Sequence, residues 1–67
     1  MEIVSTGEAA RRLGVSRDSL LAAFRTGAPE PEMPRIAGRR VFSETDIERL
    51  RAWLAPRRLA REALNHA

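Results

Sequence analysis

Two short segments with helical periodicity, separated by a glycine-containing turn, restrict how the first half of the chain can fold. The first segment, about residues 6–13, follows Ser5, and Glu8 three residues later completes a capping box, in which hydroxyl and carboxylate satisfy amides at a helix start. Gly14 supplies the left-handed backbone that ends a helix, and Ser16 can cap a second one at once. Two helices joined this tightly predict a helix-turn-helix, or an αα-corner packed only for stability.

Apolar side chains in both segments recur at the spacing of one helix face. They are Ala9, Ala10 and Leu13 in the first segment, and Leu20, Leu21 and Phe24 in the second. Each set predicts a face that packs into a core. Arg11 and Arg12 fall on the outer face of the first helix, and Gly27 marks the end of the second.

The middle of the chain predicts a loop followed by a small β-hairpin. Residues 28–34 contain three prolines and cannot be helical. Ile36 and residues 41–42 are β-prone, and Gly38 offers a turn between them. Arginines surround the expected tip: Arg35, Arg39 and Arg40. Because a two-stranded ribbon is not stable alone, we expect Ile36 and Val41 or Phe42 to pack on the helices.

Ser43, followed three residues later by Asp46, predicts the start of a third helix. Its apolar stripe recurs at helical spacing and consists of Ile47, Leu50, Trp53 and Leu54. Pro56 is expected to end this helix, because proline lacks the N–H that the next turn needs.

The segment after Pro56 is also helix-prone, and one face of that helix would carry Leu59, Ala60, Ala63 and Leu64. It could dock on the domain, meet a partner or fray. We therefore divide the chain into one domain over residues 1–55 and a C-terminal helical tail over residues 56–67.

Composition narrows the function. The 67 residues include no cysteine, and the one histidine, His66, is the penultimate residue, so the chain has neither a disulfide framework nor a ligand set for zinc. The same lack removes nucleophile systems built on His or Cys, and we expect no enzyme activity, metal or cofactor. No apolar run approaches the ~20 residues of a membrane span, and the N-terminus lacks a signal-peptide pattern. We expect a cytoplasmic binding module.

The charge is unevenly distributed along the chain. All twelve basic residues are arginines, against nine acidic residues, for a net charge of +3. Residues 1–34 carry four arginines and five acids, whereas residues 35–67 carry eight arginines and four acids. A basic half indicates a polyanionic partner, nucleic acid first. Arginine without lysine also fits a GC-rich genome, and composition alone does not separate these two explanations.

Taken in order, the expected elements are a helix, a tight turn, a helix, a proline loop, an arginine-tipped hairpin and a helix. The predicted fold class is therefore mostly α with a small β-hairpin wing, a winged helix-turn-helix. The stretch STGEAARRLGVSRDSLLAAFRTG, followed by RIAGRRVFSETDIERLRAWL, resembles the DNA-binding domain of the MerR and excisionase superfamily. Those proteins carry an E-x-A-x-x-L-G-V-S stretch, a recognition helix ending in glycine, a proline and an arginine- and glycine-containing wing. The matches run from Thr6 to Leu54.

The resemblance implies that the second helix enters the major groove, while the wing reaches the backbone or an adjacent minor groove. The expected DNA-binding residues are Ser16, Arg17, Asp18, Ser19, Ala22, Arg25, Arg35, Arg39 and Arg40. Arg17 is the first candidate for a guanine or a phosphate, because its guanidinium can span the guanine acceptors. The alternative for Arg17 is a surface arginine paired with Asp18 or Glu8.

The other candidates have more than one interpretation. Arg39 and Arg40 are favoured for phosphate, because their segment holds no acid and at least one of them must face outward. Arg25 contacts phosphate or neutralises the helix dipole. Ala22 lets the backbone approach the groove, or packs against a helix. Asp18 accepts from a cytosine amino group or orients Arg17.

We predict sequence-specific binding to double-stranded DNA by a small, nucleoid-associated transcriptional regulator or excisionase-like recombination directionality factor. About five arginine–phosphate contacts predict a slope of roughly −4 to −5 in log K against log salt. One copy is then expected to bind weakly and to need further copies on repeated sites, or a recombinase. The alternative is a protein-interaction module that keeps the fold and binds a protein partner through its tail. RNA binding is disfavoured, because all three aromatic residues are assigned to the core.

Overall fold

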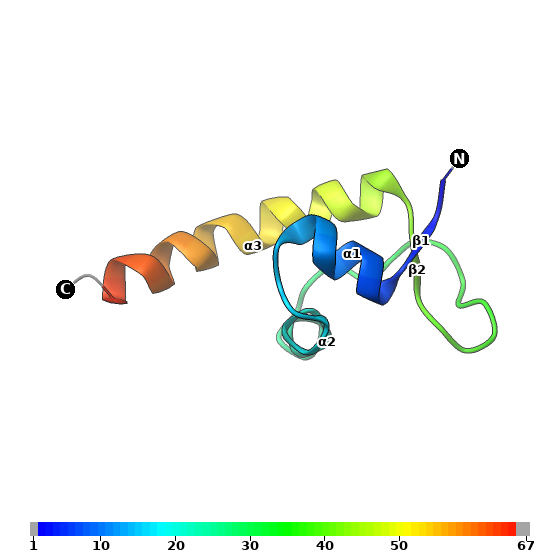
Figure 1. The fold of residues 1–67 in the computed structure, drawn as a ribbon, viewed down its shortest axis with the longest axis horizontal. Coiled ribbons are helices and arrows are strands. Elements are labelled where there is room, and N and C mark those ends of the chain that lie inside the picture. The colour runs from blue at the N-terminus through cyan, green and yellow to red at the C-terminus, as the bar shows by residue number, and fades with distance from the viewer. Residues whose placement is uncertain (1, 66–67) are drawn as a thin grey trace.

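The computed structural model describes the backbone of residues 2–65 and the side chains of residues 2–57. The elements follow in the order β1 (Val4–Ser5), α1 (Thr6–Leu13), α2 (Arg17–Arg25), β2 (Val41–Phe42) and α3 (Glu44–Asn65). Helix α1 contacts both α2 and α3, and the loop between α2 and β2 extends past the short sheet (Figure 1). The predicted class is confirmed: the chain is mostly helical with a small β element, consistent with a winged helix-turn-helix.

Helix α1 begins with half of the predicted capping box. Ser5 Oγ accepts a hydrogen bond from the Glu8 amide at 3.3 Å. The Glu8 carboxylate, which we expected to return to the helix start, instead accepts bonds of 2.6–3.0 Å from Arg11 and Arg12. Two guanidinium groups form stronger, charge-assisted bonds with this carboxylate than a backbone amide does.

The turn between α1 and α2 forms as predicted. Gly14 takes left-handed backbone (φ 73°), a conformation that costs any residue with a side chain. The Gly14 amide donates to the Arg11 carbonyl at 3.2 Å, and the Val15 amide donates to the Ala10 carbonyl at 3.0 Å. Ser16 then caps α2, so only three residues separate the two helices.

The sheet has a different strand pairing from the predicted hairpin. Strands β1 and β2 are antiparallel, and the register places Val4 opposite Phe42 and Ser5 opposite Val41. The predicted pairing of Ile36 with residues 41–42 is wrong, because Ile36 forms an isolated bridge with Arg39. The sequence did not reveal β1, since two residues are too few to show alternation.

Helix α3 begins with the full capping box that the sequence predicts. Asp46 Oδ2 accepts from the Ser43 amide and from Ser43 Oγ, each at 3.0 Å, and Ser43 Oγ accepts in turn from the Asp46 amide at 3.3 Å. The other carboxylate oxygen, Oδ1, accepts from the Glu32 amide at 3.3 Å, so the same side chain also holds the proline loop. Asp46 is buried, with every side-chain oxygen bonded.

Pro56 does not end α3, contrary to prediction, and the helix continues to Asn65. Proline at this position removes one backbone N–H. The Arg57 side chain adds a bond in the same turn, with Nη1 donating to the Trp53 carbonyl at 2.7 Å. The division between a domain over residues 1–55 and a tail therefore falls inside a continuous helix. The predicted apolar face of residues 59–64 and the terminal His66 lie outside the described side chains.

The core lies where α1, α2, β2 and the first half of α3 meet. Its buried members are Ala9, Ala10, Leu13, Leu20, Ala23, Ala28, Phe42, Ile47 and Leu50. Trp53 and Leu54 pack against it and are partly buried, which confirms the predicted stripe. Ile36 is the exception, since it is 52% exposed instead of packed on the helices. Its tight bridge to Arg39 holds it out in the loop, away from the helices.

Candidate nucleic-acid interface

The start of α2 is built by two serines. Ser16 Oγ accepts from the Ser19 amide at 3.0 Å and donates to Ser19 Oγ at 2.8 Å. These bonds fix the first turn of the helix, which carries Arg17 and Asp18 on its surface. Of the predicted site residues, Ser16 and Ser19 therefore order the turn, and Arg17 and Asp18 are presented by it.

Arg17 and Asp18 are both exposed. The alternative in which Arg17 pairs with Glu8 is not seen, because the Glu8 carboxylate is shared by Arg11 and Arg12. Hydrogen bonds from Arg11 and Arg12 lower the pKa of Glu8, so it stays ionised and bound to them. No ion pair joins Arg17 to Asp18 either, within the part of the chain that has described side chains.

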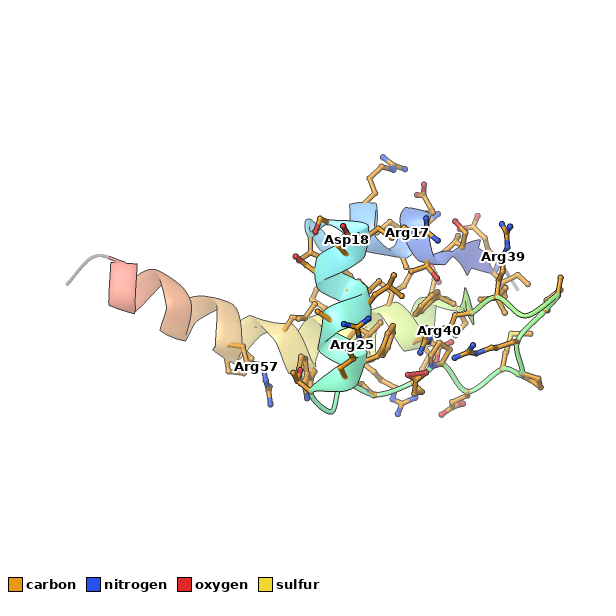
Figure 2. The ribbon with its side chains drawn as sticks, turned by 90° about the horizontal axis from the view of Figure 1, so that it is seen from below. Arg17, Asp18, Arg25, Arg39, Arg40 and Arg57 are labelled. Atoms are coloured by element: carbon orange, nitrogen blue, oxygen red, sulfur yellow. The ribbon has the colours of Figure 1, made fainter. Side chains whose placement is uncertain are left out.

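The rest of the outer face of α2 combines small and basic side chains. Ala22 and Arg25 lie one and two helical turns after Asp18, and both are exposed. Leu21, just before Ala22, is half-buried. Figure 2 shows Arg17 and Asp18 at one end of α2 and Arg25 at the other. Helical spacing thus places an acid, two apolar residues and an arginine in one outward stripe.

We use the name wing for residues 35–40. A tight two-residue turn shapes it: the amides of Ile36 and Arg39 each donate to the other's carbonyl at 3.0 Å. Ala37 (φ 51°) and Gly38 (φ 76°) both have positive φ, as a type I′ turn requires. Arg35 and Arg39 flank this turn and are exposed.

Arg40 differs from Arg39. Its guanidinium bonds both oxygens of Glu30, at 2.9 and 3.2 Å, and its Cζ lies 4.4 Å from the centre of the Phe24 ring. Residues 35–42 contain no acid, but folding brings Glu30, ten residues before Arg40, to its side chain. Phe24 in turn stacks on Phe42, with ring centres 6.1 Å apart. Arg40 therefore ties the wing to α2 and the core.

The arginines fall into two groups by their partners. Five form ion pairs within the chain: Arg11, Arg12, Arg40, Arg49 and Arg51. Among the described side chains, five have no acidic partner: Arg17, Arg25, Arg35, Arg39 and Arg57. The first four were predicted site residues and lie on α2 or the wing, and Arg57 lies on α3. Uncompensated positive charge therefore concentrates on α2 and the wing, where phosphate could take the place of a carboxylate.

One basic residue beside this surface was missed. Arg57 follows Pro56 on α3 and stacks on the Trp53 ring, with Cζ 3.7 Å from the ring centre. The sequence places Arg57 in a separate tail, because a proline at position 56 predicts the end of the helix. The helical periodicity of α3 would have placed Arg57 beside Trp53 only if the predicted helix had continued through Pro56.

Other chemistry has little support in the described residues. No group of three or more His, Cys, Asp or Glu side chains lies close enough there to hold a metal. Within the same part of the chain, no helix is long and apolar enough to span a membrane. Exposed arginine side chains on a short helix and beside a tight turn are suited instead to phosphate and base edges.

The fold and this surface define a class: a small winged helix-turn-helix protein whose uncompensated arginines lie on the second helix and the wing. The family model for MerR HTH family regulatory proteins matches residues 4–55, which is most of the chain. The chain belongs to this family of DNA-binding regulators. No curated protein and no solved structure matches it at a significant level.

Proposed function

We propose that this protein binds double-stranded DNA with α2 in the major groove and the wing on the sugar–phosphate backbone or an adjacent minor groove. The observation that carries the proposal is that some arginines are paired with carboxylates of the chain and others are not. Carboxylates neutralise the arginines on α1 and along the first half of α3, as well as Arg40 in the wing. They do not neutralise Arg17 and Arg25 on α2, or Arg35 and Arg39 in the wing. A surface that leaves its cations unpaired is suited to a polyanion.

The residues of α2 and the wing have different proposed roles. Arg17, in the first turn of α2, reads a guanine or holds a phosphate next to it, and Asp18 accepts from a cytosine amino group. Ala22 lets the helix approach the base edges. Arg25, Arg35 and Arg39 contact phosphates. Arg40 holds the wing in place through its contacts with Glu30 and Phe24. Its proposed role is therefore to position the wing, and not to contact DNA directly.

The biological role that follows is regulation of transcription, or an excisionase-like role in directing recombination. The four unpaired arginines of α2 and the wing predict a salt slope of roughly −4 for one copy. Such binding is weak at physiological salt, so we propose that copies assemble on repeated sites or act with a recombinase. DNA binding would also place the protein on the nucleoid.

Fluorescence anisotropy with random-sequence duplex and with a duplex selected by the protein from a random library tests this function. Arg39→Gln should weaken binding to both duplexes and reduce the salt slope by about 0.9. Arg17→Gln should weaken the selected duplex more, by about 1–3 kcal/mol if it spans a guanine. The matched control is Arg11→Gln, which removes the same charge from an arginine already paired with Glu8.

The result that contradicts the proposal is equal behaviour of Arg39→Gln and Arg11→Gln, or no salt-sensitive binding by the unmodified protein. The second candidate, a module that binds a protein through its tail, would then gain support. One observation favours it: α3 extends well beyond the core, and the molecule measures 44 Å along its longest axis against 20 and 18 Å across (Figure 1).

A further inference from the structure

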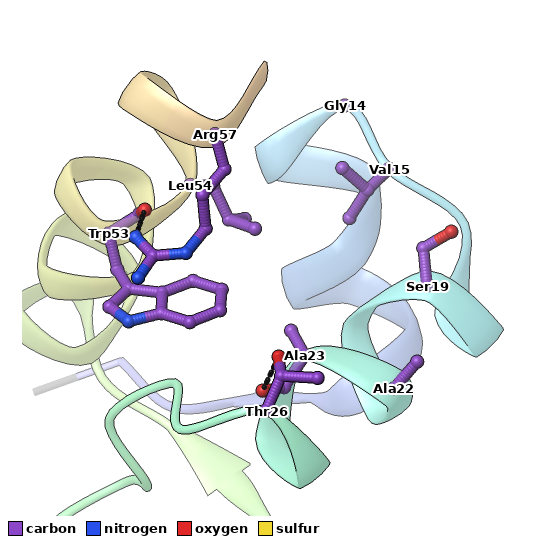
Figure 3. Close-up of a pocket in the computed structure, with 9 residues that line it drawn as sticks. All are labelled: Gly14, Val15, Ser19, Ala22, Ala23, Thr26, Trp53, Leu54 and Arg57. Atoms are coloured by element: carbon purple, nitrogen blue, oxygen red, sulfur yellow. Dashed lines mark hydrogen bonds between the residues drawn. The ribbon is translucent and has the colours of Figure 1, made fainter. Parts of the chain in front are cut away.

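Ile36, in the wing, is the most exposed large apolar side chain among the described residues, at 52%. Trp53, on α3, is by contrast partly buried and covered by the Arg57 guanidinium, as Figure 3 shows. Single exposed apolar residues are common on protein surfaces, so the surroundings of Ile36 decide whether it has a role.

The tight turn of the wing fixes the direction in which the Ile36 side chain points. Ile36 and Arg39 exchange both backbone hydrogen bonds at 3.0 Å, and residues paired in this way have their side chains on the same face of the ribbon. The next residue, Arg40, points to Phe24 and Glu30. Because successive residues of an extended segment point to opposite faces, Arg39 and Ile36 point away from the domain. An apolar side chain and an arginine without an acidic partner among the described side chains therefore share the outer face of the wing.

The loop that carries the wing is anchored on both sides of this turn. Before it, the Glu32 amide donates to the buried Asp46 carboxylate at 3.3 Å. After it, Arg40 binds Glu30 at 2.9 Å. Residues 33–39, between these anchors, are all exposed and contain no acid. The wing is therefore a narrow, anchored projection with an apolar residue and cations at its end.

These properties fit the minor groove of DNA, which is about 6 Å wide and lies between two rows of phosphates. Many proteins that bind there combine arginine with an apolar side chain, which enters a base step as a wedge and partly unstacks it. The resulting kink is directed toward the major groove. The proposed function places α2 in the major groove, so a wedge on the wing would close the DNA onto α2.

We propose that the wing enters the minor groove and that Ile36 acts there as an apolar wedge, which opens one base step and bends the DNA by about 20–90° toward α2. This proposal rests on the proposed function, and it chooses the minor groove over the backbone for the wing. Arg39, on the same face, holds a phosphate beside the wedge. Pyrimidine–purine steps unstack most easily, so the protein should prefer a TA or CA/TG step at this position. Ile36 would thus add sequence preference without a hydrogen bond to a base.

Energy transfer between dyes on the two ends of the selected duplex, saturated with the full chain, tests the proposal. The unmodified protein should raise the transfer by bending the duplex, and Ile36→Ala should lose most of this rise. Because Ile36→Ala removes no charge, its salt slope should equal that of the unmodified protein, whereas Arg39→Gln reduces the slope by about 0.9. The matched control is Ile3→Ala, which truncates an exposed isoleucine outside the wing and should keep the bend. Ile36→Met retains a long apolar side chain and should also keep it.

Two further measurements separate the wedge from other effects. Thermal unfolding should give the same Tm for Ile36→Ala and the unmodified protein, because Ile36 lies outside the core. The base analogue 2-aminopurine brightens when it is unstacked. Placed in turn at each adenine of the selected duplex, it should brighten at one step with the unmodified protein and not with Ile36→Ala.

The outcomes distinguish this inference from the proposed function. If the unmodified protein binds the selected duplex in a salt-dependent way but leaves it straight, Ile36 is not a wedge and the proposed function stands. The same conclusion follows if Ile36→Ala bends the duplex as much as the unmodified protein does. If the unmodified protein binds no duplex at any salt concentration, both proposals fail.

Discussion

Neighbouring arginines in this protein differ in what they can offer to DNA. Arg39 is exposed with no acidic partner among the described side chains, whereas Arg40 is bound by Glu30 and stacked on Phe24. Arg40 would have to break its bonds to Glu30 before it could bind a phosphate. Whether an arginine can contact DNA therefore depends on its partners within the protein as much as on its position. Local sequence identifies both as cations at a turn. It does not show the pairing, because Glu30 reaches Arg40 only after the proline loop has folded back.

Asp18 offers a prediction at the same scale. Asp18→Asn should raise the affinity for random-sequence duplex, because it removes a negative charge from the outward stripe of α2. It should also reduce discrimination at one base pair, by about 1–3 kcal/mol, if the carboxylate accepts from a cytosine amino group. Anisotropy with the selected duplex and its single-base-pair variants measures both effects. Glu48→Gln on α3, which removes an exposed acid that is paired with Arg51, serves as the control. Equal effects of the two changes would show that Asp18 does not face DNA.

At the scale of elements, Asp46 joins the start of α3 to the proline loop. Burial disfavours its ionised form, but hydrogen bonds from Ser43 and from the Glu32 amide, with Arg49 nearby, lower its pKa below the ordinary 3.8. A carboxyl group whose pKa is lower in the folded chain stabilises the fold above its unfolded pKa, about 3.9. That contribution is lost as pH falls through the folded value.

The prediction concerns the difference in unfolding free energy between the unmodified protein and Asp46→Asn, which we call the stability gap. At neutral pH the substitution should cost about 1–3 kcal/mol, because buried donors lose a charged acceptor. Below about pH 4 the gap should narrow as the native carboxylate takes up its proton. Thermal unfolding followed by circular dichroism from pH 2 to 7 measures it. Parallel curves for the two proteins over this range would show that the ionised form of Asp46 does not support α3.

Local signals predicted some elements and not others. Caps and apolar periodicity located α1, α2 and the start of α3, because serine caps and Gly14 act within one turn of the chain. Strand β1 pairs with a strand nearly forty residues away, so its own two residues could not predict the pairing. Pro56 predicts the end of a helix, yet α3 continues through it. Both the β1–β2 pairing and the continuation of α3 without the Pro56 N–H depend on the tertiary structure, which local sequence does not show.

At the scale of the whole molecule, the buried residues and the unpaired arginines occupy the same compact part. The core runs from Ala9 to Leu50, with Trp53 and Leu54 packed on it, and the interface lies on α2 and the wing beside it. The candidate site could be predicted as a set of elements, since the resemblance covers them in order. Its electrostatic pattern could not, because it depends on which carboxylates reach which arginines after folding.

This arrangement predicts that a chain ending at Arg57 keeps both fold and DNA binding. The shortened chain retains the whole described core, so its unfolding free energy should fall by less than about 1 kcal/mol, or about 4–8 °C in Tm. Its affinity for random duplex should match that of a full-length Arg58→Gln, Arg61→Gln double variant, which removes the same two arginines but keeps the helix. Thermal unfolding and anisotropy compare the three proteins. If the shortened chain loses DNA binding that the double variant keeps, residues 58–67 act as a segment, through a second copy or a protein partner, and the division of the chain after residue 55 is wrong.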